Sequence, residues 1–342
     1  MNLQTIEKNL TLEFQQSINK QKISDQKIIS IEKLTGDASS RSYFRLKTNK
    51  NSYVICHDLS LSQQSDPRVI LLQGTLGHHG VRVPRFYDVE LSQHYILQED
   101  LGDQTLLRQL ATINNVDEEY HMLEKAIDHL VKIHSIDTQL YLQACFTKEA
   151  FDQDKLMWEV NFTVKNFLGQ YLKYQLSSDE ERVIGESFEG LCRQLAAGPR
   201  LLCHRDFHAR NIMVCGDELV LIDFQDARMG LPQYDLVSLL EDCYYRYHPT
   251  NTQKIRYYYW EKFLKNKKYF NKQEDYEHTY DLMAIQRIFK AIGSFAFFAT
   301  EKQNPRYLKY IGHSFENLKF FLLKDKEWDE LRKLLCRIYY AH

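Results

Sequence analysis

The segment LLCHRDFHARNIMV, residues 201–214, carries two histidines, two arginines, an aspartate and an asparagine between apolar flanks. The residues that follow it form two short apolar runs around the turn CGDE, a pattern that predicts a β-hairpin. Hairpin pairing would bring Asp223, at the end of the second strand, back to Asn211, at the start of the first. Asp206, five residues before Asn211, would lie in the loop that leads into the hairpin.

Three converging oxygen-bearing side chains suit phosphoryl transfer. Mg²⁺ prefers hard oxygen ligands, which Asn211 and Asp223 can provide. The attacking hydroxyl needs a carboxylate that orients it and accepts its proton, and Asp206 is available for that role. An HxD motif occurs often by chance. The longer pattern is far more specific for a kinase-type catalytic loop: Asn follows HxD after four residues, and a strand, a turn, a second strand and Asp come next.

Three other polar residues lie near these. We expect His204 to hydrogen-bond the backbone and brace the loop. His208 either lines the site or caps a turn, and Asp226 either supports the metal ligands or forms a turn.

Strand patterns dominate the first hundred residues, where β-branched and aromatic runs are separated by polar turns. One helix, at 68–80, ends in glycine. The segments expected as strands are 27–34, 43–48, 53–59, 81–90 and 94–102.

From Gly102 onwards the apolar periodicity is helical, interrupted by the β segment at 201–224. The helical stretches are 117–137, 150–174, 178–197 and about 233–340. We therefore predict an α+β fold of two lobes. A small antiparallel β-rich lobe at 1–100 joins a larger, mostly helical lobe at 101–342 through a hinge at about 97–102.

The composition excludes several classes of protein. The 342 residues are 44% hydrophobic and 26% charged, with a net charge of −2, which gives no reason to expect nucleic acid or an anionic membrane as partner. The N-terminus has no apolar signal region, and the apolar stretch at 291–299 is too short to span a bilayer. Seven scattered cysteines without a CxxC pair indicate reduced thiols. We expect a cytoplasmic monomer.

The segment 201–224 resembles the aminoglycoside phosphotransferase superfamily of small-molecule kinases. KIHSID at 132–137 resembles the end of a helix of that superfamily, and YDLVSLL at 234–240 resembles the helix after its metal loop. The resemblance implies a bilobal protein-kinase-like fold that uses ATP and Mg²⁺. It also implies that Asp235 braces the backbone of the catalytic loop.

Six stretches, in order and spacing, resemble the bacterial anomeric sugar kinases of cell-wall recycling more narrowly. These enzymes use ATP to phosphorylate the C1 hydroxyl of N-acetylmuramate and N-acetylglucosamine. The resemblance covers about residues 30–320. The stretches are LTGDASSRSYFRL (34–46), VPRFYDVE (83–90), ILQEDLGDQTLL (96–107), FDQDKLMWEVNFTVKNFL (151–168), LIDFQDARMGLPQYDL (221–236) and AIQRIFKAIGSFAFF (284–298).

The resemblance also implies where the nucleotide binds. The turn at 36–41 takes the place of a glycine-rich phosphate loop, with backbone N–H groups and side chains towards the phosphates. The hinge would meet the adenine edge through its backbone. The residues expected at the nucleotide are Ser39, Ser40 and Arg41 in the turn, and Gln98, Glu99 and Leu101 at the hinge.

The third strand, YVICHDL, lacks the lysine that kinase-like folds usually place there to hold the phosphates. The anomeric sugar kinases also tend to lack it, so its absence fits the narrower resemblance. Arg41, Arg45 and His57 are the candidates that could replace it.

The helical lobe offers candidates for the sugar. Asp152 and Glu159 are seven residues apart and therefore near one helical face. Arg287 could pair with a lactyl carboxylate, and Gln286 and Lys290 share faces of the same helix. Salt bridges between helices would explain these residues equally well.

Two other functions remain open from the sequence. The chain could phosphorylate another alcohol, such as an aminoglycoside or choline, although the mixed charges above mildly disfavour a cationic acceptor. It could also be a nucleotide-binding module without turnover, but the intact Asp206, Asn211 and Asp223 count against that. The sequence does not rank muramate against glucosamine.

Overall fold

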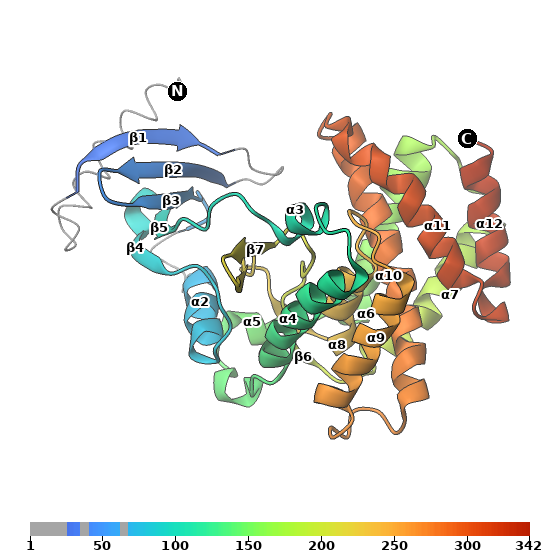
Figure 1. The fold of residues 1–342 in the computed structure, drawn as a ribbon. Coiled ribbons are helices and arrows are strands. Elements are labelled where there is room, and N and C mark those ends of the chain that lie inside the picture. Colours follow the sequence, from blue (N-terminus) through green and yellow to red (C-terminus); the bar gives the residue numbers. More distant parts are fainter. Residues whose placement is uncertain (1–25, 35–40, 62–67) are drawn as a thin grey trace.

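A β-rich lobe lies beside a larger helical lobe (Figure 1). The computed structural model describes residues 26–34, 41–61 and 68–342. The smaller lobe consists of β1 (Ile28–Lys33), β2 (Ser42–Thr48), β3 (Ser52–His57), α2 (Arg68–His78), β4 (Phe86–Glu90), η1 (Leu91–Gln93) and β5 (Tyr95–Glu99).

The strands of this lobe form one antiparallel sheet in the order β1-β2-β3-β5-β4. Side chains alternate between the two faces of each strand. Phe44, Ile55 and Leu97 therefore form a buried cluster on one face, whereas Cys56 and Ile96 point to the other face and line a cleft. The central sheet thus fills the core of the small lobe and forms a wall of the cleft.

The helical lobe is built around α10 (Gln273–Thr300), which packs against helices on several sides. The α-helices of the lobe are α3 (Leu106–Leu110), α4 (Val116–His134), α5 (Cys145–Lys148), α6 (Gln153–Thr163), α7 (Ser178–Ala196), α8 (Pro232–Leu240), α9 (Pro249–Tyr259), α10, α11 (Ile311–Leu322) and α12 (Asp329–Tyr340). Its shorter 3₁₀ and π segments are η2 (Thr138–Tyr141), η3 (Val164–Tyr171), η4 (Trp260–Leu264), η5 (Pro305–Tyr310) and η6 (Lys326–Trp328).

Helix α10 is long and apolar enough, by length and composition alone, to cross a membrane. In the structure most of it is buried by α6, α8 and α11, as is usual for the core helix of a soluble protein. Packing inside the lobe therefore accounts for its apolar character.

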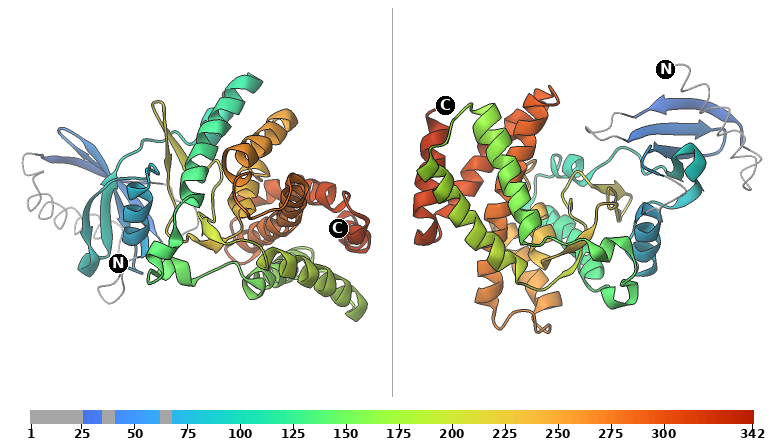
Figure 2. Two further views of the ribbon diagram at one scale, coloured as in Figure 1. Left: turned by 90° about the horizontal axis from the view of Figure 1, so that it is seen from below. Right: turned by 180° about the vertical axis from the view of Figure 1, so that it is seen from behind.

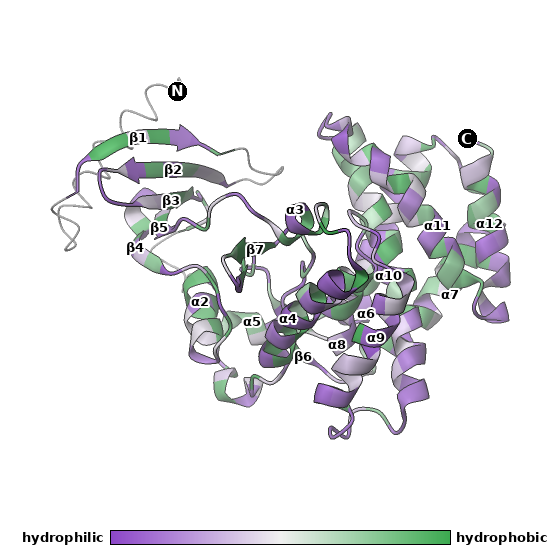
Figure 3. Ribbon diagram, in the orientation of Figure 1, coloured by the Kyte–Doolittle hydropathy of each residue, from purple (hydrophilic) through white to green (hydrophobic). Residues whose placement is uncertain are grey.

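Four short strands lie between the sheet and the long helices, as both views in Figure 2 show for the hairpin. They are β6 (Leu201–Cys203), β7 (Ile212–Cys215), β8 (Glu218–Leu221) and β9 (Arg228–Gly230). β7 and β8 form the predicted hairpin, with Ile212 opposite Leu221. β7 is green in Figure 3 because its first two residues, Ile212 and Met213, are apolar and buried.

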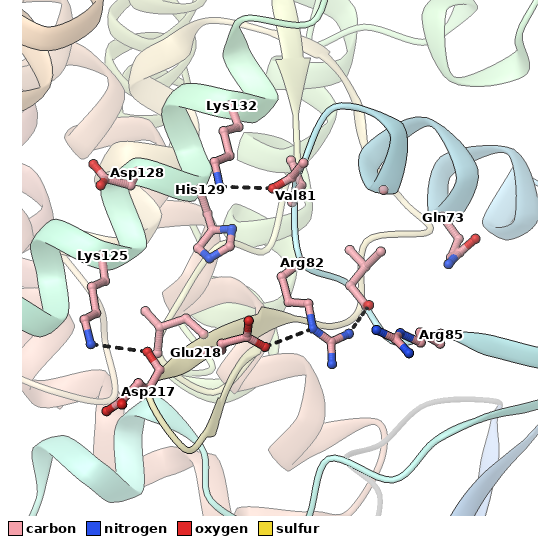
Figure 4. A pocket seen from close by; sticks show the side chains of 14 residues that line it. Gln73, Val81, Arg82, Arg85, Lys125, Asp128, His129, Lys132, Asp217 and Glu218 are labelled. Atoms are coloured by element: carbon pink, nitrogen blue, oxygen red, sulfur yellow. Dashed lines mark hydrogen bonds and ion pairs between the residues drawn. The ribbon is translucent and has the colours of Figure 1, made fainter.

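Arg82 ties the two lobes together where the small lobe meets the hairpin turn (Figure 4). Its guanidinium donates to Glu99 Oε2 at 2.8 Å and to Glu218 Oε2 at 3.4 Å. Lys125, from α4, donates to the backbone carbonyl of Asp217 at 3.2 Å. These contacts border a hollow of 590 Å³ that contains none of the catalytic or ligand-binding residues predicted above.

The predicted α+β, bilobal fold is confirmed. Most expected strands and helices are present, but the strand expected at 81–90 begins only at Phe86, and the helical stretch at about 233–340 is divided into α8, α9, α10, α11 and α12. The predicted helix 150–174 is in fact α6 followed by the π-helical turns of η3. The short strand β9, which pairs with β6, was not predicted, because three residues carry too little pattern. All seven cysteines lie in the described ranges and are free thiols, as expected.

Gly293 allows α6 and α10 to approach closely. A Cβ at this position would lie 2.3 Å from Thr163 Oγ1 and 2.6 Å from Thr163 Cα. We expect Gly293→Ala to force the helices apart and to lower the free energy of unfolding by about 1–3 kcal/mol, measured by urea denaturation. Gly190→Ala on α7 is the matched control, because a Cβ there meets nothing within 4 Å. It should be neutral or stabilising. Equal effects of the two changes would contradict the close contact.

Candidate functional site

A cleft of 1290 Å³ separates the sheet from the helical lobe. Strands β2, β3 and β5 line one side, and the hinge, the hairpin and η5 line the others. Asn211 and Asp223 both line it. The cleft is therefore the place where the predicted metal ligands and the hinge residues predicted for the nucleotide can meet a ligand.

The loop between β6 and β7 is held by two buried carboxylates. Asp235 accepts hydrogen bonds from the backbone N–H of His204 at 2.6 Å and of Arg205 at 2.9 Å. Asp242 accepts one from the backbone N–H of Ala209 at 3.1 Å. Both ends of the loop are therefore fixed by side chains that are themselves packed in the core.

Asp206 lies between these anchors, and its side chain is 26% exposed, so a ligand can reach it. Its Oδ1 lies 3.6 Å from Arg287 Nη2, and its Oδ2 lies 3.9 Å from Arg205 Nε. Burial alone would raise the pKa of Asp206. The charges of Lys290, Arg205 and Arg287 outweigh burial and hold the pKa well below its usual value. The group is therefore an ionised carboxylate throughout the neutral pH range.

The hairpin brings Asn211 and Asp223 together as predicted. Asn211 Nδ2 lies 3.4 Å from Asp223 Oδ2 and donates to the backbone carbonyl of Asp206 at 3.0 Å. Because the amide nitrogen makes these bonds, the amide oxygen is the atom that Asn211 can offer to a cation. The Asp223 side chain is 40% exposed. Two hard oxygen donors at the wall of a cleft fit the preference of Mg²⁺, which leaves its other positions to water and phosphate.

Two residues of this region have left-handed backbone, a conformation that costs free energy for residues other than glycine. Asp223 has φ 64° and Arg205 has φ 82°. The first directs the carboxylate at the end of the hairpin, and the second precedes Asp206. Such strain often occurs at functional sites.

His204 differs from the expectation. Neither of its ring nitrogens has a hydrogen-bond partner among the described residues, and the ring packs edge-on against Phe207. The loop is braced through the His204 backbone N–H instead. His208 packs edge-on against Tyr244, and burial lowers its pKa to about 3, so it is neutral.

Arg41, the first candidate for the missing lysine, lies at the cleft beside Asp223. Its Nε donates to Asp58 Oδ2 at 2.8 Å, and its Nη1 lies 3.4 Å from Asp223 Oδ1. Arg41 and Asp58 both line the cleft. Arg45, the second candidate, instead pairs with Asp100 at 2.8 Å and with Asp103, next to the hinge.

The other nucleotide candidates are placed as follows. Gln98, Glu99 and Leu101 line the cleft at the hinge, although the carboxylate of Glu99 is held by Arg82. Ser39 and Ser40 lie outside the described residues.

The residues expected to bind the acceptor make two separate sets of contacts, one at Asp206 and one in a buried pair. Arg287 contacts Asp206, and its Nε donates to Ser238 Oγ at 2.9 Å. Glu159 is 1% exposed and accepts a hydrogen bond from Gln286 Nε2 at 3.0 Å, while its Oε1 has no partner among the described residues. An unsatisfied buried oxygen of this kind calls for a water or a ligand.

Asp152 does not share a helical face with Glu159. It is exposed and occupies the N-cap of α6, where its carboxylate accepts a hydrogen bond from the backbone N–H of Lys155 at 2.8 Å. A spacing of seven places two side chains on one face only if both lie within the helix, and a cap residue turns back to the first N–H groups.

Asp226, for which the sequence left two roles open, pairs with Arg205 at 3.1 Å. Other cleft residues were not predicted, and one of them, Gln225, donates to Asp223 Oδ1 at 2.8 Å. A wall of cations and tyrosines, contributed by the catalytic loop and η5, was missed completely. It consists of Arg210, Arg306, Tyr307, Lys309 and Tyr310. The sequence NPRYLKY at 304–310 contains the signal, but nothing in it indicates that it folds over the catalytic loop.

The chain matches the model of the phosphotransferase enzyme family over residues 30–264. It is 29% identical over 308 residues to the N-acetylmuramate/N-acetylglucosamine kinase of Pseudomonas aeruginosa, covering 89% of this chain and 87% of that protein. It is 26% identical over 286 residues to the enzyme of the same name from Neisseria meningitidis, covering 80% and 82%.

Solved structures show the same fold. The choline kinase LicA of Streptococcus pneumoniae superposes with a TM-score of 0.60 at 15% identity, covering 91% of this chain and 99% of that one. The ADP-bound aminoglycoside phosphotransferase APH(2'')-Ib superposes with a TM-score of 0.57 at 19% identity, covering 89% and 97%. The family model covers well over half of the chain, and the fold agrees with it: the chain belongs to the phosphotransferase enzyme family.

Proposed function

We propose that the chain is an ATP- and Mg²⁺-dependent kinase that phosphorylates the anomeric hydroxyl of N-acetylmuramate, N-acetylglucosamine or both, in peptidoglycan recycling. One observation carries the proposal. Asn211 and Asp223 lie together at the wall of a large interlobe cleft, and Asn211 is hydrogen-bonded to the backbone of Asp206, whose partly exposed carboxylate is ionised. The names of the relatives from Pseudomonas aeruginosa and Neisseria meningitidis support the choice of acceptor.

Asp206 is the base in this proposal. Its carboxylate accepts a hydrogen bond from the C1 hydroxyl, orients the oxygen towards the γ-phosphate and takes the proton as the new O–P bond forms. Arg287 and Arg205 keep it ionised and fix its position. Asp235 and Asp242 hold the loop, so the carboxylate needs little rearrangement before reaction.

Asn211 and Asp223 would hold Mg²⁺ through their side-chain oxygens. The ion neutralises charge on the phosphates when bound. Arg41, held by Asp58, would supply the cation that the third strand lacks. Its Nη1 lies 3.4 Å from Asp223 Oδ1, which supports a role beside the proposed metal ligands and the phosphates.

A second function, transfer to a cationic alcohol, is suggested by the choline kinase and aminoglycoside phosphotransferase structures that share the fold. Cationic acceptors call for a strongly acidic acceptor side. The helical side of this cleft carries Arg210, Arg306 and Lys309 instead, which favours a neutral or anionic acceptor. A module without turnover is disfavoured because the catalytic and metal-binding side chains are intact and converge.

The proposal includes a cytoplasmic, monomeric protein. Seven free thiols support a reducing compartment. ATP is abundant there, and the sugar would be phosphorylated after import.

The first test is an ATP-consumption screen over amino sugars, aminoglycosides and choline. We expect turnover with N-acetylmuramate or N-acetylglucosamine, and a loss of about 100-fold or more in kcat for Asp206→Asn. Asp217→Asn, which changes an exposed carboxylate in the hairpin turn, is the control and should keep its activity. Turnover of an aminoglycoside without any sugar would overturn the acceptor. Full activity of Asp206→Asn would overturn the base.

A second test separates the candidates for the missing lysine. Arg41→Gln and Asp58→Asn should each raise the KM for ATP by about ten-fold or more, because each removes a charge-assisted hydrogen bond at the phosphates or at the residue that holds them. Lys47→Gln is the control for a lost charge, because Lys47 lies in β2, the strand that follows Arg41, but is exposed and paired with Glu32. An unchanged KM for ATP in Arg41→Gln, or a larger increase in Arg45→Gln, would exclude Arg41 as the replacement.

A further inference from the structure

Polar side chains from α6 and α10 lie beside the carboxylate that is proposed to act as the base. Arg287, on α10, reaches Asp206 with its Nη2 3.6 Å from Oδ1. Gln286, the residue before it, donates to Oε2 of Glu159 on α6 at 3.0 Å. Lys290 comes one turn later on α10 and therefore lies on the same side of the helix as both. The proposed catalysis by Asp206 uses only Arg287 of this group.

Two buried oxygen atoms of the group have no hydrogen-bond partner among the described residues. They are Oε1 of Glu159, which is 1% exposed, and Oε1 of Gln286, which is fully buried. The amide of Gln286 turns its nitrogen to the Glu159 carboxylate, so its oxygen remains to accept another hydrogen bond. Leaving such acceptors unsatisfied in the interior costs free energy. The pair therefore calls for a molecule that donates hydrogen bonds to it.

Lys290 supplies donors next to these acceptors. The residue is partly exposed, and its ammonium has no hydrogen-bond or ion-pair partner among the residues that the structure describes. Burial raises the pKa of Asp206, and of the charges that lower it that of Lys290 acts most strongly. The charges of Asp206 and Glu159 both act on Lys290 in turn, so the ammonium lies close to both carboxylates. Burial and the charge of Arg287 lower the pKa of Lys290 to about 8, and it stays mainly protonated at neutral pH.

The arrangement suits a neutral group that both donates and accepts hydrogen bonds. Arg287 pairs with Asp206, and the Lys290 ammonium faces the charge of Glu159, so positive and negative charges are matched. A ligand carboxylate would be attracted by Lys290 but repelled by Glu159, and it has no hydrogen to give to the open oxygens. An amide presents an N–H and a carbonyl oxygen on the same group, which fits acceptors and a donor that lie side by side.

We propose that Lys290 and the Glu159–Gln286 pair bind the acetamido group of the acceptor, with Lys290 donating to its carbonyl oxygen and the pair accepting its N–H. This inference rests on the proposed function. C2, the carbon next to C1, carries the acetamido group. An acceptor whose C1 hydroxyl is held by Asp206 therefore brings this group to the side chains beside Asp206. The enzyme would then prefer 2-acetamido sugars over sugars without this group.

The test compares N-acetylglucosamine with 2-deoxyglucose, which lacks the acetamido group but keeps the C1 hydroxyl. In the unchanged protein we expect kcat/KM to be about 100-fold or more higher for N-acetylglucosamine, because a site that hydrogen-bonds a group rejects the analogue without it. Lys290→Met and Glu159→Gln should each lower this preference about ten-fold, mainly through the KM for N-acetylglucosamine, and leave the KM for ATP unchanged. Where turnover of 2-deoxyglucose is too slow to measure, its inhibition constant against N-acetylglucosamine gives the comparison.

Lys302→Met is the matched control for the loss of a lysine charge. Lys302 lies just after the end of α10 and is exposed, with its Nζ 5.6 Å from the ring centre of Phe297. Its preference should equal that of the unchanged protein. Lys290→Arg keeps a charged donor and should retain more of the preference than Lys290→Met.

The outcomes separate this inference from the proposed function. If the protein phosphorylates no amino sugar at all, the proposed function fails and the inference with it. If it phosphorylates them but the preference is absent, or stays complete in both variants, only the acetamido site fails. A loss in Lys290→Met that is much larger for N-acetylmuramate than for N-acetylglucosamine would assign Lys290 to the lactyl carboxylate and refute the acetamido contact.

An equal fall of kcat/KM for both sugars would show that the variants disturb Asp206 or the fold, and it would also refute the contact. Thermal unfolding of each variant checks that the fold is kept. If Glu159→Gln does not fold, Lys290→Met alone decides.

Discussion

The carboxylate of Asp235, fully buried at the start of α8, holds the backbone of the catalytic loop through the N–H groups of His204 and Arg205. Burying a charge is costly unless hydrogen bonds compensate it. The buried carboxylate therefore needs these two hydrogen bonds, and the loop backbone is held in place by the same two bonds. Oδ2 of Asp235 also lies 3.5 Å from His134 Nε2, and the other ring nitrogen of His134 is hydrogen-bonded to the Tyr259 hydroxyl. Helices α4, α8 and α9 are thereby connected to one loop.

Because the loop is fixed, the positions of the side chains proposed to react are fixed with it. Asp206 is partly exposed at the middle of the loop, and the hairpin after it returns Asp223 to Asn211. The long helix α10 adds Arg287 and Lys290 from the opposite side, and the close contact at Gly293 holds α10 against α6. Arg41, from the sheet, completes the set across the cleft. The proposed chemistry thus depends on four segments that are distant in sequence and are brought together by packing.

The sequence predicted the local parts of this arrangement well. The hairpin was recognised because its strands and turn are contiguous, and the pairing of Asn211 with Asp223 follows from the antiparallel register alone. The brace by Asp235 was implied by resemblance, and the structure provides its two hydrogen bonds. Long-range packing between distant segments could not be predicted from the sequence. The sequence did not reveal that the Arg41 side chain turns to Asp58, that Asp152 caps its helix, or that η5 places Tyr307 beside Arg210.

The central claim is that this site transfers phosphate to an anomeric oxygen, and the bond that forms can be observed directly. The protein would be incubated with ATP, Mg²⁺ and N-acetylmuramate or N-acetylglucosamine enriched in ¹³C at C1, and the product examined by ¹³C and ³¹P NMR. Splitting of the C1 resonance by phosphorus is the predicted result. A phosphorylated sugar whose phosphorus couples to a different carbon, or ATP consumption without any phosphorylated sugar, would contradict it.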